Sequence, residues 1–475
     1  MDSIIIIIIA AYMLTMVGTG IYAAGRNKKT SDYLVAGRKL GVGMTAITLA
    51  AVQIGVGIVL SSATNGYNGG IWPGIYYALG CGGGLIVAGL FTARKLRAQE
   101  GYVPIDYFAK RYHGDSKPVR FWASLSNIPS LLGIFIAQML ASGGILSGFG
   151  LPFRWGVILC TGVVLIYCTI GGLWGVVLTD VIQFGVIVVG IPIFFIVMLV
   201  QFIQGGGNVG EAFSTPFIPG GMWTRFVYLV VPFLISIAMS YDAYTRVQSA
   251  KDAETAKKGC LIGGVFVIIV GFMCSAIGVF ARQKFPGVTD GIFTIAAKGS
   301  LPPVFAGIVL AAILSAAMSS ANCVILSLGS CVARDFYNRF LHPEIDNLDE
   351  LPHSKLVSQI TVFVGSLLGI WVAFYMTDIL DAMIIFNYPY MGSLVIPLLG
   401  GLLWKGATRL GAFAAAIAGG IVGVISFFIG IPSPIQGIIN LDLALLTAYL
   451  VSAIVLVVVS LFDKAGQEAN RLQKI

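Results

Sequence analysis

Three small residues in one apolar stretch form the pattern that most suggests chemistry. Ala316, Ser319 and Ser320 lie in the segment Ala311-Ala-Ile-Leu-Ser-Ala-Ala-Met-Ser-Ser-Ala-Asn-Cys323, and their spacing puts them on one face of a helix. Hydroxyl and carbonyl oxygens suit a hard cation such as sodium, so this face could supply part of an oxygen cage. Small residues also pack membrane helices together, and this segment alone leaves both interpretations open.

A second candidate is the segment Leu49-Ala-Ala-Val-Gln-Ile-Gly-Val-Gly57. Gly55 and Gly57 weaken a helix, and Gln53 adds a polar side chain to an apolar span. Non-helical backbone at membrane depth is tolerated only where it lines a protein cavity, and its freed carbonyls could bind a cation. A glycine packing groove is the alternative interpretation.

Acidic residues are scarce in the apolar segments, and Asp180 is the notable one. A carboxylate inside a membrane is costly, so it suggests a cation ligand or a proton carrier. The alternative is an interfacial residue that reaches cytoplasmic water. Asp242 precedes Arg246 by four residues, a spacing that predicts an ion pair on a helix surface.

The elements that must position these residues are membrane spans. Hydrophobic residues make up 57% of the 475 residues and charged residues 11%, with a mean hydropathy of +0.91. This composition is typical of an all-α polytopic membrane protein. We expect about thirteen transmembrane helices, at 3–24, 42–65, 71–93, 119–148, 155–171, 173–204, 224–246, 260–283, 302–331, 355–377, 380–403, 410–431 and 439–462.

The positive charges predict the orientation. With the N-terminus outside, 24 of the 29 Lys and Arg residues fall on the cytoplasmic side, and the C-terminus is then inside. The net charge of +8 thus reflects membrane topology and does not indicate a nucleic-acid partner. We expect the first span to be retained, because it lacks a positive n-region and a clear cleavage site.

The sequence offers no arrangement for catalysis. The seven cysteines are scattered through apolar spans or their ends, which predicts no disulfide or metal framework. The three histidines fall in expected cytoplasmic loops, and no nucleophile–base motif or phosphate-binding loop occurs. We therefore expect no enzyme activity.

Several stretches resemble the sodium:solute symporter family, which includes proline, sugar and sialic-acid symporters. They are Thr30-Ser-Asp-Tyr-Leu-Val-Ala-Gly-Arg38, Tyr102-Val-Pro-Ile-Asp-Tyr-Phe-Ala-Lys-Arg-Tyr112, Gly171-Gly-Leu-Trp-Gly-Val-Val-Leu-Thr-Asp-Val-Ile-Gln183, Arg246-Val-Gln-Ser-Ala-Lys-Asp252, Arg334-Asp-Phe-Tyr337 and Gly401-Leu-Leu-Trp-Lys-Gly-Ala-Thr-Arg-Leu-Gly-Ala412. The resemblance covers about residues 30–420 and is specific in combination.

The resemblance implies a LeuT-like fold with two inverted repeats of five helices each. Residues 41–205 would form the first repeat (helices 2–6) and 222–405 the second (helices 7–11). Residues 1–40 would form a peripheral first helix and a cytoplasmic loop. Residues 406–475 would form peripheral helices 12 and 13 and a cytoplasmic tail.

The resemblance also implies a sodium site. Its ligands would be the carbonyls of Ala51, Ile54 and Ala316 and the hydroxyls of Ser319 and Ser320. Asp180 matches the acidic residue of a second sodium site found in some members. However, Gly55, Asn322 and Cys323 stand where those members have serines. Asp180 would then be a transient ligand or a structural anchor.

The solute is less defined. Gly57-Ile58 replaces the Glu-Gln pair of the sugar symporters and Gln53 replaces the aspartate of the proline symporters, which disfavours both solutes. We expect no Lys or Arg inside the bundle. Candidate cavity residues are Gln53, Trp72, Tyr76, Gln138, Tyr241 and Asn387, with packing as the alternative for the aromatic ones.

The favoured hypothesis is a sodium-driven symporter of a small organic solute, such as an amino acid or a carboxylate, that works by alternating access. Sodium would be the coupling ion, with no other cofactor. The transport unit would be monomeric and lie in the plasma membrane, or in the inner membrane of a Gram-negative cell. A proton-coupled or uncoupled carrier that uses Asp180 is the alternative. A channel is disfavoured, because no charged ring or polar pore stripe is visible. A sensor is disfavoured, because we expect only about ten residues after the last span.

Overall fold

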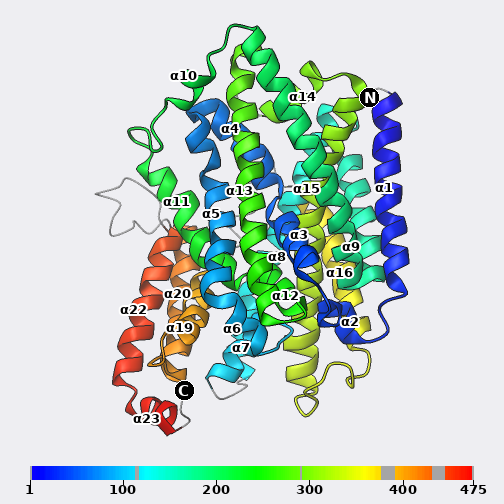
Figure 1. Cartoon of the computed structure of the whole chain (residues 1–475). Coiled ribbons are helices and arrows are strands. Elements are labelled where there is room, and N and C mark those ends of the chain that lie inside the picture. The colour runs from blue at the N-terminus through cyan, green and yellow to red at the C-terminus, as the bar shows by residue number, and fades with distance from the viewer. Residues whose placement is uncertain (1–2, 113–116, 289–290, 376–390, 430–443, 473–475) are drawn as a thin grey trace.

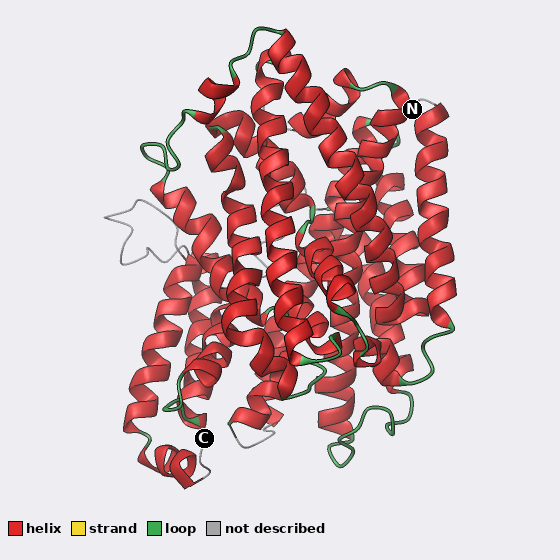
Figure 2. Cartoon of the chain, in the orientation of Figure 1, coloured by secondary structure: helices red, strands yellow, loops and turns green. Residues whose placement is uncertain are grey.

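The computed structural model describes residues 3–112, 117–288, 291–375, 391–429 and 444–472, and every named element in them is a helix (Figures 1 and 2). The α-helices of the first half are α1 (Ser3–Ala24), α2 (Thr30–Val35), α3 (Val42–Gln53), α4 (Val56–Gly69), α5 (Ile71–Val87), α6 (Ala93–Ala98), α7 (Pro104–Arg111), α8 (Lys117–Gly148), α9 (Phe153–Gln204) and α10 (Val209–Phe213). Those of the second half are α11 (Trp223–Ser236), α12 (Tyr241–Ser249), α13 (Ala253–Lys284), α14 (Ile292–Ser300), α15 (Pro303–Cys331), α16 (Ser354–Ala373), α19 (Ile396–Leu403), α20 (Arg409–Ile429), α22 (Ala444–Phe462) and α23 (Lys464–Leu472). Short 3-10 or π-helical turns are η1 (Ala36–Arg38), η2 (Ala88–Thr92), η3 (Ile237–Met239), η4 (Val332–Leu341) and η5 (Met391–Val395).

Helices long and apolar enough to cross a membrane dominate the chain. The described residues contain 8 of them, or up to 10 when each of two bent helix pairs counts as one span. Two shorter apolar helices, Met391–Leu403 and Arg409–Ile425, add to these. The chain is therefore a polytopic membrane protein as predicted, while the number of thirteen spans and the orientation stay predictions.

Helix α9 contains two of the expected spans. Its 52 residues would measure about 78 Å if straight, more than twice the hydrocarbon core of about 30 Å. The helix breaks at Gly172, where φ is 51° and ψ is −150°. A Cβ at Gly172 would lie 2.4 Å from the ring of Tyr33, so both the backbone angle and the close approach require glycine. The break falls where we expected the boundary between segments 155–171 and 173–204.

Two spans are interrupted near their middle. Helices α3 and α4 meet at an angle of 56° across Ile54 and Gly55, where the sequence predicts a break. The helical segment Trp223–Met239 meets α12 at 43° across Ser240, although we expected a continuous span over 224–246. These are the first spans of the two expected repeats. Discontinuous helices of this kind form the binding sites of many transporters.

The site residues lie on the most enclosed helix. Every residue of α15 from Val309 to Cys331 is buried, and α15 packs against α8, α9 and α16. Helix α13 lies in the centre of the view in Figure 1 and packs against α3, α4 and α5. Helices α1 and α22 lie at opposite edges, and α1 begins at the end of the molecule opposite α23 (Figure 1). The polar groups of α15 thus find their partners in other helices rather than in lipid.

Candidate cation site and central cavity

The break between α3 and α4 exposes carbonyls that two serines of α15 reach. A helix end leaves its last carbonyls without intrahelical partners. The Ser319 hydroxyl donates to the Ala51 carbonyl at 2.8 Å, and the Ser320 hydroxyl donates to the Val52 carbonyl at 2.7 Å. Both serines are buried, and the Ser319 hydroxyl also lies 3.1 Å from the Ala316 carbonyl. The two candidate segments of the sequence, 49–57 and 311–323, therefore lie in contact.

Gly55 makes this approach possible. A Cβ at this position would lie 2.6 Å from the Ser320 hydroxyl and 3.3 Å from the Gln138 side chain. The next residue, Val56, donates its backbone N–H to the Gln138 side-chain oxygen at 3.2 Å, which holds the start of α4 against α8. A side chain larger than hydrogen at Gly55 would push α4 away from α15.

The sequence-predicted ligands are distributed around this contact. Ala51, Ala316, Ser319 and Ser320 come together, and Ile54 lies in the break, two residues after Val52. The Val52 carbonyl was not among the predicted ligands, because the resemblance implied only the carbonyls of Ala51 and Ile54 at this break. Carbonyl and hydroxyl oxygens form a donor set that suits a hard monovalent cation. A serine hydroxyl can turn its lone pairs toward such an ion when its hydrogen rotates away.

Asp180 lies in the same region, fully buried on α9. It accepts hydrogen bonds from the Thr48 hydroxyl and from the Asn322 amide nitrogen, the latter at 3.2 Å. Its carboxylate is also 3.4 Å from the Arg246 guanidinium. Asp180 therefore joins α3, α9, α12 and α15 through three side chains.

Arg246 corrects two sequence predictions. We expected no Lys or Arg inside the bundle and a surface ion pair between Asp242 and Arg246. Arg246 is instead completely buried, and its guanidinium binds Asp180 and the Thr48 hydroxyl, the latter at 3.1 Å. It reaches Asp242 only at the backbone carbonyl, at 3.4 Å. The bend before α12 turns this part of the helix inward, which explains why the i, i+4 pattern did not predict its surroundings.

A cavity of about 80 Å³ adjoins the serine pair. Gln53, Gln138 and Tyr241 line it as predicted candidates, and Ser320 belongs to both the cavity and the serine–carbonyl contact. Asp242 also lines it, and its carboxylate accepts a hydrogen bond from the Gln53 side-chain nitrogen at 2.9 Å. Both broken spans thus contribute residues to the same cavity.

The other cavity candidates lie elsewhere. Trp72 packs against Phe213 and Phe217, and the Tyr76 hydroxyl donates to the Phe217 carbonyl, so neither is among the lining residues. Tyr77, one residue further along α5, lines the cavity instead. Asn387 falls outside the described residues. Successive side chains on a helix point in directions about 100° apart, so the sequence alone does not show which of two neighbouring tyrosines faces the cavity.

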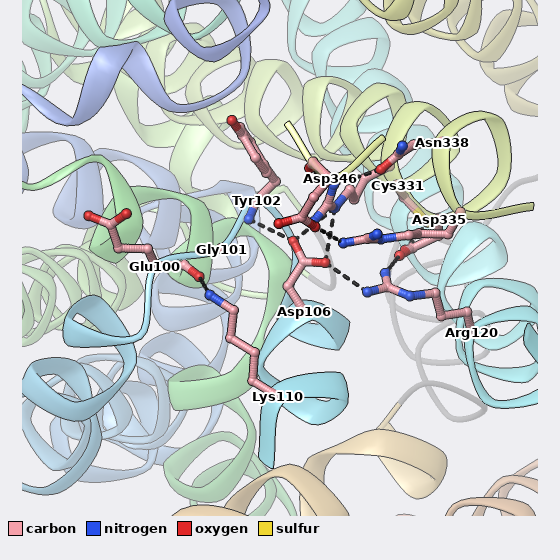
Figure 3. Close-up of polar contacts among 12 residues, drawn as sticks. Glu100, Gly101, Tyr102, Asp106, Lys110, Arg120, Cys331, Asp335, Asn338 and Asp346 are labelled. Carbon is pink, nitrogen blue, oxygen red and sulfur yellow. Dashed lines mark hydrogen bonds and ion pairs between the residues drawn. The ribbon is translucent and has the colours of Figure 1, made fainter. Parts of the chain in front are cut away.

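A buried network of charged side chains joins α7, α8 and η4. Arg120 at the start of α8 binds Asp106 of α7 at 2.8 Å and Asp335 of η4 at 2.6 Å (Figure 3). Arg334 binds Asp106 at 3.0 Å, and all four side chains are buried. Tyr241, which lines the cavity, donates its hydroxyl to Asp335 at 3.1 Å. The network therefore connects the cavity wall to the ends of three helical segments.

An all-helical bundle in which two interrupted spans meet at a polar cavity is the architecture of a secondary transporter. The model of the sodium:solute symporter family matches residues 33–419. The chain therefore belongs to the sodium:solute symporter family, and it is a multi-pass protein of the plasma membrane that carries out sodium-coupled symport.

Named relatives and solved structures agree with this assignment. The chain is 25% identical to the osmoregulated proline transporter OpuE of Bacillus subtilis, over 98% of this chain and 96% of the relative. It is 25% identical to the sodium/pantothenate symporter of Escherichia coli, over 88% of this chain and 89% of the relative. Among solved structures, an outward-open sodium-coupled sialic acid symporter with substrate bound matches with a TM-score of 0.79, 20% identity and coverage of 98% of both chains. Mhp1, a nucleobase-cation-symport-1 family transporter, matches with a TM-score of 0.59 and 15% identity, over 92% of this chain and 97% of that chain. These structures support the LeuT-like fold.

Proposed function

We propose that the chain carries a small organic solute into the cell together with sodium, which binds where α15 meets the break between α3 and α4. The ligands would be the carbonyls of Ala51, Ile54 and Ala316 and the hydroxyls of Ser319 and Ser320. The observation that supports this best is the pair of serine hydroxyls held on the Ala51 and Val52 carbonyls. An oxygen cluster fully enclosed by protein can replace the hydration shell of the ion.

The solute would occupy the adjoining cavity, so that the two binding events are coupled through shared residues. Ser320 contacts the carbonyl of Val52 and also lines the cavity. Sodium would hold the broken end of α3 against α15 and so shape the wall that the solute meets. By linkage, the solute must then raise the affinity for sodium by the same factor. A single chain contains both sites, which supports a monomeric transport unit.

The driving force is sufficient for accumulation. One charge moving across about 100 mV releases roughly 2.3 kcal/mol. A tenfold sodium gradient adds about 1.4 kcal/mol. Together, near 3.7 kcal/mol, they support a solute gradient of the order of 500-fold with one sodium per solute.

A proton-coupled or uncoupled carrier that uses Asp180 is the second candidate function. The contacts of Asp180 favour a structural role, because Arg246, Thr48 and Asn322 hold its carboxylate. A proton carrier needs a carboxylate that is alternately released, whereas this one joins four helices. We therefore propose that Asp180 anchors the bundle.

Transport by purified protein in liposomes separates the two functions. Solute uptake is measured with sodium, potassium or choline outside, each at pH 6 and pH 8. Uptake that requires sodium and differs little between the two pH values is the expected result. Uptake that persists in potassium and follows the pH gradient would support the proton-coupled carrier and contradict the sodium proposal.

A further inference from the structure

We propose that the Asp242 carboxylate recognises a positively charged nitrogen on the solute, so that the transported molecule is an organic cation or a zwitterion. The inference rests on the proposed function, since it assumes that the cavity beside Ser320 receives the solute. It assigns a chemical class to the solute, whose identity the proposed function leaves undefined. Three features of the cavity support it.

The first feature is that Asp242 has no basic partner among the described residues. Its carboxylate makes a hydrogen bond with the Gln53 side chain and takes part in no ion pair there. Arg246, the partner expected from spacing, directs its guanidinium to Asp180 and Thr48 and reaches Asp242 only at the backbone carbonyl. The ion pair of Arg246 is made with Asp180, so the Asp242 carboxylate is left without an ion-pair partner of its own among the described residues.

The second feature is the charge of the cavity wall. Asp242 is the one charged residue among the described residues that line it. Asp242 is half-buried, and a carboxylate partly withdrawn from water without a counter-charge gains from pairing with a bound monovalent cation. A solute that carries only negative charge would instead meet an unscreened carboxylate and be repelled.

The third feature distinguishes an organic cation from a second sodium ion. Sodium needs several oxygen ligands, but the neighbour of the Asp242 carboxylate is the side-chain nitrogen of Gln53. Besides serine and amide side chains, the wall presents an apolar and aromatic surface, with Ile58, Leu131 and Phe233 beside Tyr77 and Tyr241. Aromatic rings and a carboxylate together suit a substituted ammonium group, whose carbon atoms are buried while its charge is paired.

The cavity also offers groups for the other end of a zwitterion. Helix α4 begins at Val56, so its positive N-terminal end faces the cavity at Gly57. Asn127 also lines the cavity, and its amide nitrogen has no hydrogen-bond partner among the described residues. Both are donors that suit a carboxylate, so a zwitterion could pair both of its charges in the cavity.

A binding screen on the purified full chain tests the proposal. Thermal stability is measured in sodium chloride and in potassium chloride with three groups of probes. The first group holds L-proline, glycine betaine, choline and putrescine, which carry positively charged nitrogen. The second holds pantothenate and N-acetylneuraminate, which are anions, and the third holds glucose, which is neutral. We expect stabilisation in sodium by members of the first group only.

Variants of Asp242 make the test specific. Asp242→Asn should weaken binding of the responding probe by about 30-fold or more, because it removes one partner of a desolvated charge pair. Asp242→Glu keeps the charge and should retain the preference for the first group with weaker affinity. Glu344→Gln, which changes an exposed carboxylate outside the cavity, is the control and should bind like wild type.

The possible outcomes separate this inference from the proposed function. Stabilisation by anions or glucose alone, no stabilisation by any probe of the first group, or unchanged binding in Asp242→Asn would overturn the inference. The inference would also be overturned if wild type binds two sodium ions per chain and Asp242→Asn binds one but still binds the solute, because Asp242 would then be a sodium ligand. Stabilisation by the first group equally in potassium would sink the sodium proposal and leave the role of Asp242 standing.

Discussion

Buried polar residues near the centre of the bundle form two separate groups. Ser319 and Ser320 contact backbone carbonyls, which is the arrangement for a cation. Asp180 and Arg246 contact each other, together with Thr48 and Asn322, which is the arrangement for a structural link. The first group can exchange its hydrogen bonds for an ion, whereas the second already balances its charge.

The structural role of Asp180 predicts a loss of stability when it is neutralised. Asp180→Asn leaves the Arg246 guanidinium buried without a counter-charge, which should cost about 3–5 kcal/mol of unfolding free energy. Arg246→Met should cost a similar amount. The double variant should be more stable than either single variant, because no unpaired charge remains. Thermal unfolding in detergent measures all three.

The control for this comparison is Glu344→Gln, in which an exposed carboxylate next to His342 is changed. Exposed pairs contribute little, so its unfolding temperature should match that of wild type. If Asp180→Asn proves as stable as this control but no longer transports, then Asp180 acts in coupling rather than as an anchor.

Local spacing predicted part of this chemistry. The serine pair was found because a helix brings positions three and four residues apart to one face, and that geometry needs no tertiary information. The partner of Asp180 was not found, because Arg246 lies 66 residues away and reaches Asp180 only after α12 bends inward. The spacing of residues along the sequence does not predict contacts between side chains of different helices.

At the scale of elements, the two interrupted spans place the cavity. The first break was predictable, since Gly55 and Gly57 weaken the helix and Gln53 is polar. The second, at Ser240, was missed. The polar run from Ser240 to Arg246 was visible, but we interpreted it as the cytoplasmic end of a continuous helix. A serine just before an aspartate-containing turn is also typical of a helix start.

The first break predicts a strong effect of a single methyl group. Gly55→Ala places a Cβ 2.6 Å from the Ser320 hydroxyl, so the serine or α4 must shift. We expect a loss of about 1–3 kcal/mol of stability, as for other overpacked sites. We also expect a roughly tenfold higher sodium concentration for half-maximal stabilisation, which corresponds to about 1.4 kcal/mol of lost binding.

Gly41→Ala is the matched control. Gly41 also precedes a helix, with φ of −77° against −87° at Gly55, but a Cβ there would meet nothing within 4 Å. Its stability and its sodium response should stay close to wild type. Equal effects of the two alanines would mean that glycine is needed for backbone freedom and not for the approach of Ser320.

At the scale of the whole molecule, the charged network around Arg120 holds one end of the bundle together. Burial of the Asp106 carboxyl opposes its ionisation, but the guanidinium groups of Arg334 and Arg120 outweigh burial and hold its pKa well below the usual range. A carboxyl whose pKa falls on folding stabilises the protein fully above its ordinary pKa of about 3.9. That contribution is lost only as the pH falls further, toward the lowered pKa of the folded state.

The network therefore predicts a specific pH dependence. The difference in unfolding temperature between wild type and Asp106→Asn should stay constant from pH 8 to pH 5 and shrink below about pH 4. Thermal unfolding at a series of pH values measures it. A difference that already shrinks between pH 7 and pH 5 would show that Asp106 is not held ionised by its two arginines.

The overall fold was the most predictable level. Long apolar segments predict spanning helices from composition alone, and Gly172 marks the turn within α9 because only glycine fits there. The arrangement of these helices was predictable only through the resemblance to a family, since apolar helices carry little information about their neighbours. The wall of the cavity, with Asp242 and Tyr77, depends on the second break and could not be derived from the pattern.

Equilibrium binding of radioactive sodium to the purified protein tests the proposed sodium site most directly, because it requires no knowledge of the solute. Wild type should bind sodium saturably, and Ser330→Ala should bind it equally well, since the hydroxyl of this buried serine of α15 donates to the Leu326 carbonyl of its own helix. The sodium affinity of the double variant Ser319→Ala/Ser320→Ala should be at least tenfold lower, which corresponds to a loss of about 1.4 kcal/mol of binding free energy. Unchanged sodium affinity in a folded double variant would contradict the proposal that these serines bind the coupling ion.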